Sequence, residues 1–328
     1  MIGFLLRRFL WFLLTLWAVV TVSFFLMRAV RGGPFSSERS LHPVVERNLD
    51  ARYHLDWSLG KQYLQYVGPF NLDQRGPRFL GGDGTKPFGG VLTGDLGPSF
   101  KYRDFTVNDI IAQSLPISVA LGTVALLWAI LLGLTTGILS ALWRGGRLDL
   151  SLRVAATGGI ALPNFVIAGF LILALVFGAR LFPVAGWGTL SHLFLPGLAL
   201  GAPFAAYISR LTRTGMLEVL SQDHIRTAHA KGLPPRLVLL RHAIKGGLLP
   251  VVSYLGPATA GILTGSLVIE RIFAIPGTGS HFVNSALNRD YTLSMGVTIL
   301  YTVLVYALNL IVDLAYTLLD PRIELEEA

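Results

Sequence analysis

Residues 110–143 read IIAQSLPISVALGTVALLWAILLGLTTGILSALW and contain no Asp, Glu, Lys or Arg. A bilayer core about 30 Å thick needs roughly 20 apolar residues in a helix that rises about 1.5 Å per residue. The stretch is long enough to cross a membrane, so it predicts an all-α integral membrane protein. Because Pro116 stands near its start, we expect the first residues to form a non-helical or interfacial approach to the span.

Five more charge-free stretches lie on either side of this one. They run from Phe9 to Met27, Val154 to Ala179, Leu181 to Ser209, Gly246 to Ile269 and Tyr291 to Val312. The composition agrees, since 52% of the 328 residues are hydrophobic and only 14% are charged, which leaves too little polar surface to cover a soluble globule. We therefore expect six transmembrane helices. The first follows Arg7 and Arg8, is longer than a signal-peptide core and lacks an A-x-A cleavage site, so we interpret it as a retained anchor.

Basic residues in the short connections predict the orientation. If the N-terminus lies inside, the inner connections hold Arg7, Arg8, Arg144, Arg147, Arg153, Arg322 and the Lys and Arg residues of 210–245, whereas the short outer loops hold Arg180, Arg271 and Arg289. Both termini are then cytoplasmic. The predicted organisation is an anchor helix at 1–29, an extracytoplasmic lobe at 30–109, a core at 110–319 and a tail at 320–328. Within the lobe we expect short helices around Pro43–Leu49 and Gly60–Tyr66.

The chain lacks the common signatures of catalysis and cofactor binding. It has no cysteine, which excludes disulfides, thiolate metal sites and a Cys nucleophile. It contains no phosphate-binding loop of the G-x-x-x-x-G-K-[ST] type and no pair of histidines at i and i+4, so we expect no nucleotide hydrolysis and no metal site. Ion-coupled carriers commonly place ionisable residues inside the membrane. Since the spans carry almost none, any transport would draw its energy from outside this chain.

The connection at 210–245, RLTRTGMLEVLSQDHIRTAHAKGLPPRLVLLRHAIK, is longer than its neighbours. One predicted helix carries a stripe of Leu217, Leu220, His224, Ala228 and Lys231 and ends at Gly232, and a second carries Leu237, Leu240, Ile244 and Leu248. Pro234 and Pro235 turn the chain between them. The pattern predicts a helical hairpin at about 211–246, on the cytoplasmic side. From spacing alone, a solvated basic loop is an equal alternative, while a hairpin held at the bilayer surface is poorly placed to bind DNA.

Within this hairpin, RTAHAKG resembles the EAA loop of permease subunits of binding-protein-dependent ABC importers. Arg226-Thr227-Ala228 takes the place of Glu-Ala-Ala, and Gly232 matches the glycine that follows. The leading Arg226 and the long interval before Pro250 are similar to the peptide and nickel branch. In that family the loop forms a coupling helix that docks on a cytoplasmic ATPase. The resemblance implies that Arg226, Thr227, Ala228, Lys231, Gly232, Leu233 and Arg236 form this coupling site, with the basic side chains able to contact either the ATPase or anionic lipid.

Other motifs extend the resemblance over nearly the whole chain. They are GDLG at 94–97, LPISVALG from Leu115, LPNF at 162–165, VIERIFAIPGTGSHFVNSALNRDY at 268–291 and DPRIE at 320–324. Together they resemble the B-type permeases of oligopeptide, dipeptide and nickel importers, with the oligopeptide branch the most similar. The resemblance implies the type I importer fold and a multi-pass protein of a bacterial or archaeal inner membrane. It also implies a second permease, two ATPases that carry ATP and Mg²⁺, and an extracytoplasmic substrate-binding protein.

Small and helix-breaking residues suggest where the chain contacts other helices or the transported molecule. Gly133 and Gly137, like Gly261 and Gly265, stand one turn apart and allow close helix contact, whether within the chain or with a second permease. Gly256 and Pro257 predict an irregular fifth span, and irregular backbone is tolerated where it lines a cavity. We therefore expect Asn164, Gly256, Pro257 and Gly261 to line a translocation pathway. A stand-alone channel or secondary carrier, or a membrane scaffold without transport, are the alternatives from other classes.

Overall fold

The protein was analysed as a computed structural model, which describes residues 2–29, 34, 43–68, 72, 90–102, 104–264 and 266–319. Regular structure in these residues is helical, apart from one isolated bridge between Pro98 and Thr106, which confirms the all-α prediction. The chain divides into two compact units. Unit 1 comprises Met1–Pro116, Ser280–Tyr306 and Leu325–Ala328, and unit 2 comprises Ile117–Gly279 and Ala307–Glu324. The limits predicted at residues 29, 109 and 319 mark where the chain enters or leaves the membrane. The division into compact units does not test them, so they stay predictions.

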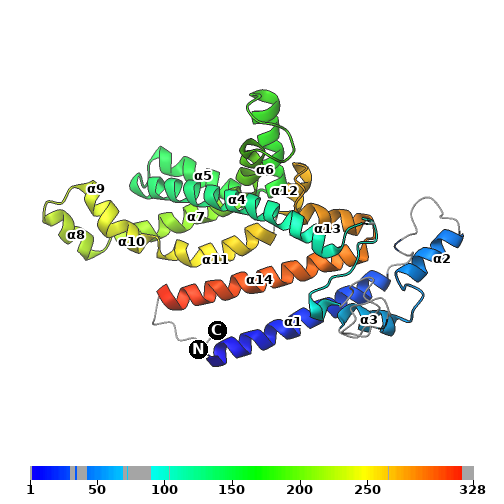
Figure 1. The fold of residues 1–328 in the computed structure, drawn as a ribbon. Coiled ribbons are helices and arrows are strands. Elements are labelled where there is room, and N and C mark those ends of the chain that lie inside the picture. Colours follow the sequence, from blue (N-terminus) through cyan, green and yellow to red (C-terminus); the bar gives the residue numbers. More distant parts are fainter. Residues whose placement is uncertain are drawn as a thin grey trace. The chain divides into compact units, whose positions relative to one another are not determined.

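Five helical segments in the described residues are long and apolar enough to cross a membrane. They are α1 (Ile2–Ala29), α4 (Val107–Leu142), α7 (Leu190–Leu220), the pair α11 and α12 (Leu249–Thr264 and Leu267–Ile272), and α14 (Tyr291–Leu319), all labelled in Figure 1. Five of the six charge-free stretches thus coincide with helices of spanning length.

The remaining stretch, Val154–Ala179, is bent. It contains α5 (Arg147–Ala161) and α6 (Asn164–Leu171), the latter continuing as a π-helical segment (Ile172–Gly178), and the two parts meet at 116°. Leu162 at the bend is extended, with φ −86° and ψ 130°, because the ring of Pro163 disfavours the helical conformation in the residue before it. The pair is either one broken span or a re-entrant loop, so the described residues contain five candidate spans, or six if the pair counts as one.

The prolines at the starts of two spans behave differently from the prediction. Pro116 lies inside α4, so the non-helical start expected for this span is wrong, and Pro196 and Pro203 likewise lie inside α7. Proline is tolerated in membrane helices because neighbouring helices and hydroxyl side chains take up the backbone groups that it leaves unpaired. Pro183, in contrast, lies in the non-helical segment before α7, as expected.

Unit 1 contains the two predicted short helices, α2 (Pro43–Arg52) and α3 (Leu59–Val67). The second packs on α1, where the Tyr63 hydroxyl lies 2.7 Å from Oγ1 of Thr21 and Nε of Arg28 donates to Gln62 at 2.8 Å. Most of 69–89, including the glycines at 81–84, lies outside the described residues. A 3₁₀ turn (Val91–Thr93) leads toward α4, and α13 (Thr278–Leu287) precedes α14.

In unit 2, α7 is the central helix and packs on α5, α6, α10 and α11. At several of these contacts, glycines allow two helix backbones to approach closely. A Cβ on Gly201 would strike the carbonyl of Ala125 in α4, and one on Gly133 would lie 2.6 Å from Ile208 in α7. Gly137 is similarly close to Thr212, so this pair of glycines packs inside the chain, one of the two alternatives expected. Gly265, the second glycine of the other pair, lies outside the described residues.

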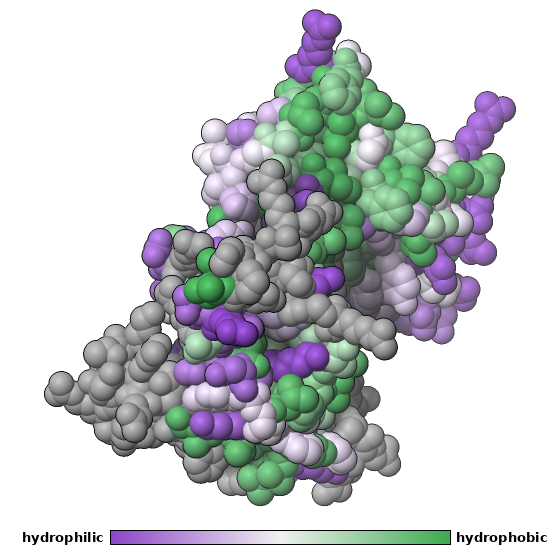
Figure 2. All heavy atoms as spheres, turned by 90° about the vertical axis from the view of Figure 1, so that its right-hand side faces the viewer, coloured by the Kyte–Doolittle hydropathy of each residue, from purple (hydrophilic) through white to green (hydrophobic). Residues whose placement is uncertain are grey.

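The outer surface of unit 2 is apolar over α6 and the segment that follows it. Phe170, Leu173 and Phe177 are each more than 60% exposed. Figure 2 shows hydrophobic side chains gathered over the upper part of the molecule, where Figure 1 places α6. An apolar surface of this kind is suited to lipid or to another membrane helix.

Candidate functional site

The predicted hairpin is present beyond the end of α7, but it begins with a break. Its first arm is α8 (Asp223–Ala230), and its second runs through α9 (Pro235–Val238), a π-helical segment (Leu239–Ala243) and α10 (Ile244–Gly247). The single helix expected from Leu217 to Lys231 is wrong, because α7 ends at Leu220. Ser221 Oγ donates to the Glu218 carbonyl there, and Gln222 is extended with ψ 154°.

Gly232 forms the tip of the hairpin as predicted. Its φ is +75°, a left-handed conformation that costs a residue with a Cβ about 1 kcal/mol. Its amide donates to the His229 carbonyl at 2.9 Å, and the Leu233 amide donates to that of Ala228 at 3.3 Å. A Cβ added at Gly232 would meet no atom within 4 Å, so the chain itself leaves room at the tip.

A small apolar core joins the two arms of the hairpin. Its buried members are Ala141, Met216, Val219, Ile225, Ala228, Val238 and Ala243. Ala228 therefore packs within the hairpin and does not itself face a partner. On the second arm the expected stripe is wrong in part, since Leu240 is 58% exposed. The π-helical segment places one more residue in the turn, so burial passes from Val238 to Ala243 at a spacing of five.

The other predicted coupling residues gather at the exposed surface of the hairpin. Arg226, Thr227, Lys231, Gly232 and Arg236 are exposed, and Leu233 is half-buried over the core. The Arg226 guanidinium lies 3.3 Å from the Asp223 carboxylate, but both side chains are largely in solvent, so this pair contributes about 1 kcal/mol or less. The hairpin therefore presents cationic groups that are available to an external surface.

The hairpin is held to α7 by a contact between backbones. A Cβ on Gly215 of α7 would strike the carbonyl of Gly247 in α10, and a Cβ on Gly247 would lie 3.1 Å from Cα of Met216. No larger side chain fits at this crossing. Movement of the hairpin is thus tied to movement of the C-terminal end of α7.

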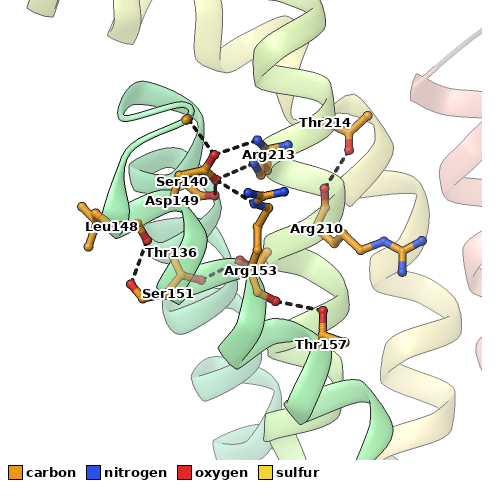
Figure 3. A network of polar contacts seen from close by, with 12 residues as sticks. Thr136, Ser140, Leu148, Asp149, Ser151, Arg153, Thr157, Arg210, Arg213 and Thr214 are labelled. Carbon is orange, nitrogen blue, oxygen red and sulfur yellow. Dashed lines mark hydrogen bonds and ion pairs between the residues drawn. The ribbon is translucent and has the colours of Figure 1, made fainter.

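A buried ion pair braces the same end of α7 against the turn between α4 and α5 (Figure 3). Asp149 is 1% exposed and accepts two hydrogen bonds from Arg213 of α7, from Nε at 2.8 Å and from an Nη at 3.0 Å. Ser140 Oγ also donates to it at 2.5 Å and the Gly145 amide at 2.9 Å. Sequence reasoning missed this pair, since nothing in the pattern links residues 64 positions apart.

The predicted pathway residues are only partly brought together. Gly256, Pro257 and Gly261 share α11, whereas Asn164 begins α6, which packs mainly on α7 and α12. The irregularity expected at Pro257 is wrong, because α11 continues through it to Thr264. A Cβ on Gly261 would lie 3.1 Å from the Phe204 ring, so this glycine lets α11 approach α7. One turn away, the rings of Tyr207 and Tyr254 are 4.3 Å apart.

The chain is similar to known membrane transport proteins. Residues 133–325 match the family model described as binding-protein-dependent transport system inner membrane component. The chain is 43% identical over 325 residues to the oligopeptide transport system permease protein OppB of Salmonella typhimurium, covering 98% of this chain and 99% of that one. It is 41% identical over 327 residues to the dipeptide transport system permease protein DppB of Bacillus subtilis, covering 100% and 99%.

The fold also resembles a solved structure. A chain of the MetNI methionine ABC transporter in an inward-facing conformation aligns with a TM-score of 0.54 and 16% identity, covering 64% of this chain and 96% of that chain. At this identity the likeness supports the fold alone.

Proposed function

Because this chain belongs to the family of binding-protein-dependent transport system inner membrane components, we propose that it is the permease subunit of an ATP-driven importer of oligopeptides. Relatives named as oligopeptide and dipeptide permeases align with it almost from end to end. Dipeptides or a nickel complex are the alternative cargo. The chain forms one half of a translocation pathway and is not itself an enzyme.

The observation that carries this proposal is the exposed cationic hairpin fixed to the end of α7. Arg226, Lys231 and Arg236 stand in solvent on a short, internally packed structure, which is the form of a docking element. The contact of Gly215 with Gly247 transmits its movement to α7. Since the chain has no phosphate-binding loop, ATP and Mg²⁺ reside on two separate cytoplasmic ATPase subunits, and the hairpin couples to one of them.

The remaining partners follow from the same role. A second permease supplies the other half of the pathway, and an extracytoplasmic binding protein delivers the cargo toward the lobe that contains α2 and α3. The apolar side chains of α6 face lipid or the second permease. Both termini lie in the cytoplasm of a bacterial or archaeal cell, which follows from the distribution of Lys and Arg.

Co-purification and reconstitution test the function. The tagged chain should bring down a second permease and ATPases, and the assembly in liposomes should take up peptide only with ATP and the binding protein. The purified chain alone should show no ATPase activity. Uptake by this chain alone would favour a channel or carrier, and an assembly without uptake would favour a scaffold.

Orientation can be tested with single cysteines, because the natural chain contains none. Ser221 and Ser58 are both exposed, one at the hairpin and the other before α3. A membrane-impermeant maleimide applied to intact spheroplasts should label Ser58→Cys and not Ser221→Cys. The reverse pattern would invert the proposed topology.

A further inference from the structure

Glu270, in the last turn of α12, is completely buried within unit 2. It lies in a helical segment apolar enough to span a membrane, where an ionisable side chain is costly and is usually functional. Oε1 of Glu270 accepts hydrogen bonds from Ser266 Oγ at 2.6 Å and from Ser118 Oγ at 2.8 Å. The first donor is on the same helix, whereas Ser118 belongs to α4. The carboxylate therefore joins two spanning helices.

The turn that follows α12 folds around this carboxylate. The Ile275 amide donates to the Glu270 carbonyl at 2.9 Å. A Cβ on Gly277 would strike Oε2 of Glu270, and one on Gly279 would lie 3.0 Å from the same atom. The glycines of this turn are thus required because the carboxylate occupies the space of their side chains.

One hydroxyl of α4 carries the connection to the turn. Ser118 Oγ lies 2.9 Å from Oγ1 of Thr278 and also accepts the Thr278 amide at 2.9 Å. Ser118, Glu270 and Thr278 are all buried, so water does not compete for these bonds in this conformation. Two polar contacts between the turn and α4 thus meet at this side-chain oxygen, so a small displacement of Ser118 would break both.

These residues stand where the chain passes between its two compact units. The chain enters unit 2 between Pro116 and Ile117 and leaves it between Gly279 and Ser280. Ser118 lies just inside the first crossing and Thr278 just inside the second. Unit 2 also contains Ala307–Glu324, so these are two of the places at which the chain passes between the units, and the Ser118–Thr278 contact connects them from within unit 2.

We propose that Glu270 is a positioning residue of the transport cycle, which holds the Ile275–Gly279 turn against Ser118 of α4 in the resting transporter, and that this contact breaks and re-forms in each cycle. The inference rests on the proposed function, since it assigns to these residues a step of ATP-driven import. In the predicted orientation the contact lies toward the outer side, where cargo enters.

The absence of natural cysteines allows a direct test in the full transporter. In Ser118→Cys/Thr278→Cys the two sulfur atoms would replace oxygens 2.9 Å apart, close enough to form a disulfide after a small adjustment. Oxidation should abolish uptake, and a reductant should restore it, while each single-cysteine variant should be indifferent to both treatments. Full uptake with the cross-link shown complete by mass spectrometry would overturn the proposal. Failure of the cross-link to form in the resting transporter would also overturn it, because the contact would not then exist.

Glu270→Gln supplies a second readout. It keeps the size of the side chain but weakens acceptance from Ser118, so the resting contact should open more readily. We expect ATPase activity without the binding protein to rise several-fold toward the stimulated rate, at an unchanged amount of assembled transporter. A merely structural role would lower both rates together and leave their ratio unchanged. Failure of the proposed function would be seen separately, as absence of ATP-driven uptake by the unmodified chain with its partners.

Discussion

Two buried carboxylates of unit 2 are held in different ways. Asp149 faces the guanidinium of Arg213 through two hydrogen bonds, with Ser140 and the Gly145 amide as further donors. Glu270 accepts a hydrogen bond from the uncharged hydroxyl of Ser118 in α4. A bidentate guanidinium contact fixes geometry and is costly to separate, whereas one neutral hydroxyl donor is exchanged far more easily.

The difference indicates that the connections of unit 2 are unequal. The brace at Asp149 ties the turn between α4 and α5 to the end of α7, to which the hairpin is attached. The contact at Ser118 ties another part of α4 to the turn after α12 through hydroxyl and amide groups. If the hairpin moves during transport, we expect the first connection to resist separation more than the second.

The largest effect is expected from Gly232→Glu, which places a negative charge at the tip of the hairpin. Because a Cβ there meets nothing within 4 Å, the chain should fold and insert, but the partner surface should be blocked. We predict normal membrane levels, no uptake and no stimulation of ATPase activity by loaded binding protein. Gly94→Glu is the matched control, since Gly94 is also exposed, has φ +80° and would also meet no atom within 4 Å. An equal loss of uptake and of stimulated ATPase activity in both variants would show that the hairpin has no specific coupling role.

Asp149→Ala should have the next largest effect. It leaves the Arg213 guanidinium without its carboxylate, and removing one partner of a buried pair is strongly destabilising. We expect lower membrane levels and reduced uptake per transporter, measured by immunoblot and peptide accumulation. Asp149→Ala/Arg213→Ala should be less impaired than Asp149→Ala, because the guanidinium of Arg213 is removed as well, and the other cation beside Asp149, Arg153, is half-exposed to solvent. A double variant that is the sum of the two single variants would show that the brace carries no coupling energy.

Gly215→Ala tests the attachment of the hairpin to α7. The added methyl group would strike the Gly247 carbonyl, and overpacking of this kind typically costs about 1–3 kcal/mol. Thermal unfolding of the purified transporter should begin at a lower temperature. Gly158→Ala in α5 is the control, since its Cβ would meet nothing within 4 Å and alanine favours a helix. An unchanged unfolding temperature for Gly215→Ala would mean that the crossing is looser than described.

Arg236→Ala should have the smallest effect. Arg236 is exposed beside the hairpin tip, and a single exposed charge usually contributes about 1 kcal/mol or less to a contact. We expect a modest fall in stimulated ATPase activity that grows at low salt and vanishes at high salt. A loss as complete as that of Gly232→Glu would instead make Arg236 a central contact of the docking surface.

The sequence predicted the spanning helices well because freedom from charge over 20 or more residues is a direct requirement of the bilayer. The left-handed turn at Gly232 followed as directly, since glycine tolerates positive φ. The prediction missed two places where the helix is interrupted. The third apolar stretch bends before Pro163, and the helix expected from Leu217 to Lys231 breaks at Gln222.

Contacts between residues far apart in the chain could not be predicted from local sequence patterns. Asp149 and Arg213 are distant in the chain and meet only when α5 packs on α7. Glu270 was excluded from the fifth stretch because that stretch was cut at the first charged residue, although the helix continues and buries it. A search for charge-free stretches ends a predicted span at such a carboxylate. In the structure, each of these carboxylates is buried and forms hydrogen bonds that link two helices.

The bend at Leu162 and Pro163 has a consequence for biosynthesis. Each arm is short, and the 15 residues of α5 rise about 22 Å, less than the thickness of the bilayer core. The first arm also begins with the charged residues Arg147 and Asp149. Because the insertion machinery releases hydrophobic segments into lipid, we do not expect it to release this arm alone. The Asp149 carboxylate lies 3.4 Å from Arg153 of its own helix, but its two hydrogen bonds from Arg213 can form only when α7 has been synthesised. This part of the chain should therefore wait beside the insertion channel until α7 emerges, and the two should enter the lipid together.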